Sequence, residues 1–157
     1  MAGTRVTSKA AAPRGRMVDT AELETAVGLW LRLAQQQELR AFSRMFSEYG
    51  MSQVLFAILL VVASNPGCRQ ADLEAPLRIR QPNLVEPIEA LITRGLMLRE
   101  PDPADRRAQT LKLTAKGETL LAELRGVHDR LIDGYRKQMG AQNYDRLVGL
   151  LKTFVED

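Results

Sequence analysis

The chain is poor in the residues on which catalysis, metal binding and disulfide cross-linking depend. It has one cysteine, Cys68, and one histidine, His128. A lone cysteine excludes an intramolecular disulfide and fits a reducing compartment, and the two residues together offer no spacing typical of a zinc site. A glycine-rich phosphate loop is also missing. We therefore expect neither an enzyme nor a metalloprotein, and no cofactor, and we expect His128 to be a structural or surface residue.

Long apolar runs are missing as well. The longest, Val54–Ala63, has about half of the ~20 residues that a membrane span requires, and the first residues lack the apolar segment of a signal peptide. Aromatic residues make up only 5% of the chain, yet a hydrophobic fraction of 45% is enough for a core. The composition predicts one cytoplasmic domain without a membrane partner.

Positive charge is in modest excess, with a net charge of +3 and an isoelectric point near 9.3. This balance is compatible with a nucleic-acid partner but says nothing about the fold. Residues 1–18 contain four basic residues and no acidic one. They predict a flexible basic arm, which either has no role or adds contacts to phosphates.

The rest of the chain reads mainly as helices. Helical spacing predicts a long first helix from near Asp19 to about Tyr49, with Glu22 completing a capping box at its start. The helix from Gln81 or Pro82, which Gly95 ends, has its apolar positions at Leu84, Val85, Ile88, Leu91 and Ile92. The predicted helices are, in order, residues 19–49, 52–64, 70–77, 81–94, 115–139 and 141–155.

A β-hairpin is predicted between two of these helices. Extended runs at residues 96–99 and 109–114 flank a proline-rich turn that suits neither a helix nor a central strand. The turn carries two adjacent arginines, Arg106 and Arg107, which a DNA backbone or minor groove explains better than folding does. Two helices joined by a tight connection and followed by such a hairpin form a winged helix-turn-helix.

These motifs, in this order, resemble the MarR family of bacterial transcriptional regulators. The resemblance covers roughly residues 21–157. It is most specific at Asp102–Arg107 and at Leu111–Gly117, which are similar to the family's wing signature of Asp-Arg-Arg followed by Leu-Thr-x-x-Gly. The resemblance implies a mainly α fold with a small β-hairpin wing. Residues 19–50 and 118–157 would form a dimerisation region, and residues 51–117 the winged helix-turn-helix DNA-binding domain.

The same resemblance implies a function. The protein would be a homodimer that binds a palindromic operator in double-stranded DNA, represses an adjacent operon and releases it when a small molecule binds. An aromatic acid or its coenzyme A thioester is the effector that the family suggests. A winged-helix module that binds another protein and never DNA is the alternative from a different class.

Five residues are the candidates for DNA contact. Arg80, Gln81 and Asn83 would face the major groove, where arginine pairs with guanine and the two amides pair with adenine. Arg106 or Arg107 would enter the minor groove while the other contacts phosphate, and we expect Arg106→Ala to weaken binding across all sequences. The alternatives are an ordinary polar helix start capped by Asn83, and a wing with local Asp–Arg pairs. Pro87 predicts a kink or a shortened first turn.

The effector site and the single cysteine are less sharply defined by the sequence. Large apolar residues that would line a pocket between the dimer helices and the winged domain are equally good core residues: Trp30, Met45, Phe46, Met51 and Phe56. Cys68 is either a small residue in a turn or the sensor of a redox-responsive regulator.

Overall fold

The computed structural model describes residues 19–105 and 107–156, so the predicted basic arm lies outside the described residues. The chain divides into two units, Met1–Gln35 and Gln36–Asp157. In the first unit a single turn of helix, α1 (Ala21–Glu24), is followed by the start of α2 (Val27–Phe46). The prediction of one unbroken helix from near Asp19 is therefore wrong at residues 25 and 26.

The break has a local cause. The Thr25 hydroxyl and N–H both donate to the Glu22 carbonyl, at 2.7 and 3.3 Å, and this closes α1 after one turn. The Trp30 indole N–H then donates to the Glu24 carbonyl at 2.7 Å, which accounts for an acceptor that the helix no longer uses. The predicted capping box does not form either, because the residue before the helix is Thr20 and its hydroxyl donates to the Glu24 carboxylate at 2.7 Å.

The second unit begins with the end of α2. A short 3₁₀ turn, η1 (Ser47–Tyr49), follows, and Gly50 leaves it with a left-handed φ of 56°. Helix α3 (Gln53–Ser64) is capped by the Ser52 hydroxyl, which accepts from the Leu55 N–H at 3.3 Å. The predicted end near Gly50 and the predicted apolar helix are both confirmed.

The helix-turn-helix differs from the prediction in its first half. A two-residue strand, β1 (Cys68–Arg69), precedes a 3₁₀ turn, η2 (Gln70–Leu73), and one turn of α-helix, α4 (Glu74–Leu77). The second helix, α5 (Gln81–Thr93), runs through Pro87 without interruption, so the shortened first turn that Pro87 predicted does not occur. Only the Asn83 carbonyl loses its intrahelical donor at this point, and Asn83 is exposed, where water can supply one.

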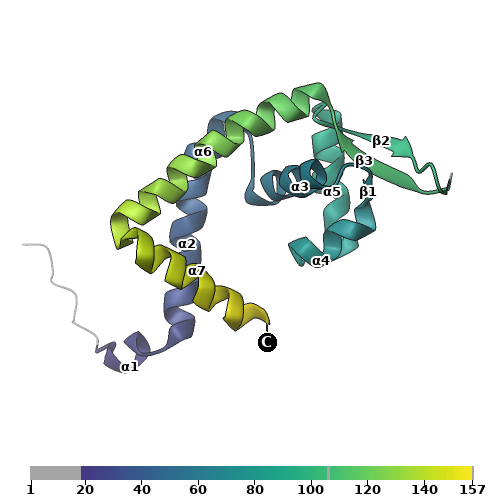
Figure 1. Ribbon diagram of the computed structural model, residues 1–157. Helices are drawn as coiled ribbons and strands as arrows, with labels where there is room; N and C mark the ends of the chain where they lie inside the picture. Colours follow the sequence, from purple (N-terminus) through teal and green to yellow (C-terminus); the bar gives the residue numbers. More distant parts are fainter. Residues whose placement is uncertain (1–18, 106, 157) are drawn as a thin grey trace, which may run out of the picture. The chain divides into compact units, whose positions relative to one another are not determined.

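The predicted hairpin is confirmed and gains a third strand. Strand β2 (Met97–Pro101) pairs antiparallel with β3 (Gln109–Leu113), with Met97 opposite Leu113. Strand β1 pairs with the other edge of β3, which gives the order β1-β3-β2. Figure 1 shows β2 and β3 projecting beyond the helices as a wing.

Two helices complete the chain. Helix α6 (Ala115–Met139) begins where the Thr114 hydroxyl accepts from the Gly117 N–H at 3.0 Å, and it ends at Gly140, whose φ is 88°. Helix α7 (Ala141–Glu156) follows directly and has no buried residue. Both helices lie where the periodicity predicts them.

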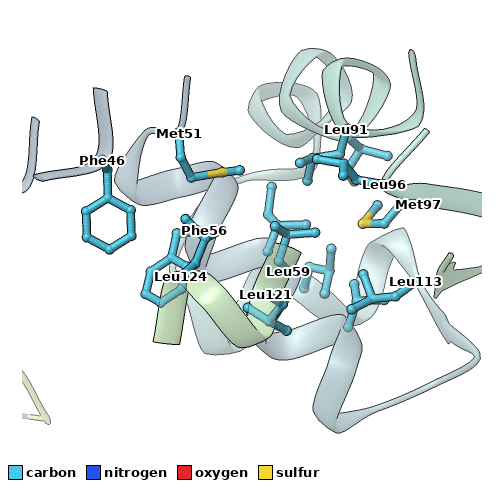
Figure 2. Packing of buried hydrophobic residues seen from close by; sticks show 14 of the residues in the cluster. Phe46, Met51, Phe56, Leu59, Leu91, Leu96, Met97, Leu113, Leu121 and Leu124 are labelled. Carbon is cyan, nitrogen blue, oxygen red and sulfur yellow. The ribbon is translucent and has the colours of Figure 1, made fainter. Parts of the chain in front are cut away.

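The core of the second unit lies between α3, α5, the sheet and α6 (Figure 2). Phe56 of α3, Leu124 of α6 and Met51 belong to this core cluster, as do Leu91, Leu96 and Met97 from the end of α5 to the start of β2. Val85 does not join the other apolar positions of α5, because its side chain is 46% exposed. Among the described residues, no single helix is long and apolar enough to cross a membrane; α2 and α3 pass that test only as a bent pair.

Candidate nucleic-acid interface

The first residues of α5 form a polar surface that is open to solvent. Arg80 precedes the helix in an extended conformation, and Gln81 and Asn83 lie in its first turn with exposed side chains. No side chain caps this end, so Asn83 does not have the capping role that was its alternative. Pro82 has no N–H and the Asn83 N–H donates to the Arg80 carbonyl at 2.9 Å. The helix dipole and the exposed side chains therefore make the start of α5 favourable for a phosphate or a base edge.

Buried contacts hold this end of α5 in place. Leu84 and Ile88 are fully buried on its inner side, and Leu73 of η2 is buried with them. The Gln70 side-chain amide donates to the Gln81 carbonyl at 3.5 Å, which links the two halves of the helix-turn-helix. The connection is tight because Arg78, which ends α4, takes a left-handed φ of 52°. The exposed side chains of α5 therefore project from a fixed base.

An ion pair from outside the hairpin fixes the wing tip. Arg69 of β1 donates to one oxygen of Asp102 through Nε at 2.8 Å and Nη2 at 2.6 Å. The pKa of the Asp102 carboxyl is lowered, first by the Ala104 N–H that donates to it and then by Arg69. Sequence reasoning missed Arg69, since its partner lies 33 residues away and the strand that carries it is too short to show a pattern.

The wing tip leaves Arg107 exposed. The Arg107 N–H donates to the Asp105 carboxylate at 3.0 Å, but within the described ranges its guanidinium forms no ion pair. Arg106 lies outside the described residues. The alternative of a wing with local Asp–Arg pairs does not hold for the described residues. Asp102 pairs with Arg69 of β1, and the exposed Arg107 is available to another molecule.

Two further arginines tie the interface together. Arg99 of β2 donates to the Glu89 carboxylate of α5 at 2.5 Å, which fixes the wing against the helix. Arg94 donates to the Tyr49 and Gly50 carbonyls at 2.7 and 2.9 Å, and Lys116 donates to the Arg94 carbonyl at 2.8 Å. The sequence gives no signal for these partners because each bond joins separate elements. Arg99 thus joins the wing to α5, while Arg94 joins the end of α5 to the segment after α2 and Lys116 joins it to α6.

The five candidate effector residues lie in different surroundings. Phe46, Met51 and Phe56 are almost fully buried, and the Phe46 and Phe56 rings are 5.2 Å apart between centroids. Met45 is half-buried against the same cluster. Trp30, in the first unit, is 54% exposed.

One polar group near this aromatic cluster was not singled out from the sequence. Tyr135 of α6 packs against the core, and its hydroxyl is buried without a hydrogen-bond partner among the described residues. Burial raises the pKa of Tyr135, and the Glu38 carboxylate raises it further. The sequence gives no signal for this donor, because whether a tyrosine hydroxyl finds a partner depends on the fold around it.

The remaining reactive side chains give no sign of catalysis. Burial raises the pKa of the Cys68 thiol, and the Asp72 carboxylate raises it further, so the reactive thiolate is disfavoured. His128 is half-buried with its ring 5.2 Å from that of Phe56. In the part of the chain that the structure describes, no group of three potential ligands could hold a metal ion.

Comparison with known proteins adds independent findings. A family described as a winged helix DNA-binding domain matches residues 51–117. Over 127 residues the chain is 29% identical to the transcriptional regulatory protein for the hcr operon of Thauera aromatica, covering 80% of this chain and 76% of that protein.

Solved structures extend the likeness to most of the chain. The transcriptional repressor CouR bound to a 23-mer DNA duplex is 31% identical with a TM-score of 0.85, covering 89% of this chain and 99% of CouR. CouR bound to p-coumaroyl-CoA is 29% identical with a TM-score of 0.81 over 90% and 99% of the two chains. MarR of Escherichia coli shares the fold at 22% identity, with a TM-score of 0.69 over 82% and 96%.

Proposed function

Because the chain belongs to the MarR family of winged-helix, DNA-binding transcriptional repressors, we propose that it acts as a homodimer on a palindromic operator that controls an adjacent operon. The observation that carries this proposal is the exposed polar start of α5, on a helix joined to the wing by the Arg99–Glu89 ion pair, together with the exposed Arg107 of that wing. The likeness to CouR in complex with a DNA duplex supports it. The site of action is the cytoplasm.

Each candidate residue has a role in this proposal. Arg80, Gln81 and Asn83 read base edges in the major groove, Arg with guanine and the amides with adenine. Arg107, with its neighbour Arg106, reaches the minor groove or the phosphates beside it.

The proposed dimer would cover apolar side chains that the single chain leaves in solvent. Residues 51–117 form the DNA-binding domain, and residues 19–50 and 118–157 form the dimerisation region. Leu150 and Phe154 of α7 are each 60% exposed, and Val27 at the start of α2 is 61% exposed. Exposed apolar faces of this kind commonly mark an association surface, and two-fold symmetry is the usual way to bury one. A two-fold dimer would place its two α5 helices on half-sites separated by about one turn of DNA.

The effector in this proposal is a small aromatic acid or its coenzyme A thioester. CouR has been solved with p-coumaroyl-CoA, and another relative, PcaV of Streptomyces coelicolor, with its natural ligand. The wall of the pocket would come from the five apolar candidates, Trp30, Met45, Phe46, Met51 and Phe56. Release of DNA requires that the effector bind one dimer conformation more tightly than the other.

Gel retardation with the DNA upstream of the protein's own gene tests this function. We expect a retarded complex at low salt that is lost when one member of a panel of aromatic acids and their thioesters is added. The alternative is a protein-interaction module. It would be supported if the immobilised protein bound another protein from a lysate of its own cells but retarded no DNA between 50 and 200 mM salt.

A further inference from the structure

We infer that Val85 reads the methyl group of a thymine in the major groove, as a specificity-determining residue of α5. The inference rests on the proposed operator binding and adds a base that none of the polar candidates recognises. The helical pattern of α5 placed Val85 among the apolar core positions, but its side chain is 46% exposed in the structure. Among the described residues, Val85 is not part of the hydrophobic core cluster.

The neighbours of Val85 place it on the outer side of the helix. Gln81 and Glu89 lie four residues before and after it, so the three side chains form one row along α5. All three are exposed, whereas Leu84 and Ile88, next to Val85 in the sequence and in the following turn, are fully buried. The row begins in the first turn of α5, the end that would enter the groove.

The chemistry of the row singles out Val85. Gln81 presents an amide that can both donate and accept, which suits adenine. The Glu89 carboxylate is bound by Arg99 at 2.5 Å, so its charge is compensated and it is held toward the wing. Val85 alone offers an apolar surface. In the major groove the matching apolar group is the C5 methyl of thymine.

The shape of valine adds to the fit. A β-branched side chain in a helix has one strongly preferred rotamer, so the two methyl groups of Val85 are already fixed before DNA binds. Side chains four residues apart are about 6 Å apart along the helix, which corresponds to roughly two base pairs. The thymine read by Val85 should therefore lie within about two base pairs of an adenine read by Gln81.

Uracil interference on the intact protein tests the inference, because uracil differs from thymine only by the missing methyl. The probe is the retarded upstream fragment, prepared with a fraction of its thymines replaced by uracil. For the parent protein, uracil at one thymine in each half-site should weaken binding about fourfold, the effect of removing one buried methyl group. Val85→Ala should abolish the interference at that thymine.

Two further variants make the result specific. Val85→Thr keeps a γ-methyl group and should retain the interference. Thr93→Ala removes an exposed side chain from the same helix, about 12 Å further along it, and should leave the pattern unchanged. Circular dichroism should show that all three variants keep the helix content of the parent.

The outcomes separate this inference from the function on which it rests. Retardation without uracil interference, or interference that survives in Val85→Ala, overturns the role of Val85 and leaves operator binding intact. No retardation of any upstream fragment overturns both. Interference lost in Val85→Ala and kept in Val85→Thr and Thr93→Ala supports the inference.

Discussion

Gly117 has no side chain, and this allows the start of α6 to pack closely against the backbone before the wing. A Cβ atom at this position would lie 2.0 Å from the Leu96 carbonyl oxygen, which belongs to the backbone and cannot rotate away. That carbonyl already accepts from the Thr114 N–H at 3.1 Å. The glycine of the Leu-Thr-x-x-Gly motif therefore permits the close approach of the start of α6 to the chain between α5 and β2.

We predict that Gly117→Ala destabilises the protein by about 3 kcal/mol, because the backbone must shift to accept the methyl group. Urea unfolding measures the change. Gly134→Ala, in the same helix but with no atom within 4 Å of its Cβ position, is the matched control. It should leave stability unchanged or raise it by up to about 1 kcal/mol. Equal effects of the two substitutions would contradict the steric explanation.

Asn83 and Arg107 should differ in what their loss does to DNA binding. Asn83→Ala should cost about 1 to 3 kcal/mol on the operator and little on unrelated DNA, because an amide reads a base. Arg107→Ala should weaken binding to both DNAs and lower the salt dependence by about one ion, because it contacts phosphate or the minor groove. Fluorescence anisotropy on the two DNAs measures both quantities. Equal loss on both DNAs for Asn83→Ala would show that it does not read a base.

The elements that the sequence predicts well are those whose pattern is long and local. Helices α3 and α6 are confirmed close to their predicted bounds, because a periodic apolar stripe lies within the segment itself. The break between α1 and α2 was missed, since it depends on hydrogen bonds of Thr25 and Trp30 that no periodicity reveals. Strand β1 was missed because two residues acquire a strand conformation only by pairing with β3.

The residues of the candidate interface also differ in whether the sequence alone could predict them. The polar start of α5 and the arginines of the wing are visible as types and spacings in the sequence. Arg69, Arg94 and Arg99, which hold these parts together, have partners on other elements, and such pairings follow from the fold rather than from local sequence.

The Asp102 carboxylate, which accepts from the Ala104 N–H and from Arg69, should make stability depend on pH. The pKa of Asp102 is lower in the folded protein than its ordinary value of about 3.9, so the unfolded chain binds the proton more readily. The stabilisation is therefore complete well above that value and is lost as the pH falls through the folded pKa. Urea unfolding should show Asp102→Asn to be less stable than the parent near neutral pH, with the difference shrinking in acid.

Glu100→Gln is the matched control for Asp102→Asn. Glu100→Gln removes a wing ion pair that is 3.9 Å long and exposed on both sides, and it should change stability little. A difference between Asp102→Asn and the parent that stays constant down to strongly acidic pH would show that the negative charge of Asp102, held by the Ala104 N–H and Arg69, does not stabilise the fold.

The complete protein, in the proposed account, is a dimer that presents two copies of the DNA-reading surface. Its affinity would arise from two α5 helices and two wings that act together, while its specificity would arise from a few side chains at each half-site. The exposed apolar residues of α7 are the part of the single chain that supports this assembly best.

We predict that Phe154→Asp shifts the protein from dimer to monomer, because it places a charge on an apolar face that the dimer would bury. Analytical ultracentrifugation measures the change. Lys152→Glu, a charge reversal on the other side of α7, should leave the dimer intact. A parent protein that sediments as a monomer at all concentrations would contradict the proposed assembly.

The salt dependence of operator binding tests the central claim most directly. Anisotropy titrations of the full-length protein with the upstream fragment, between 50 and 200 mM salt, give the slope of log K against log salt concentration. A dimer that places arginines from two wings and two α5 helices against phosphates should lose about 10³-fold in affinity over this range. Binding that does not change with salt, or no binding at 50 mM, would contradict the account.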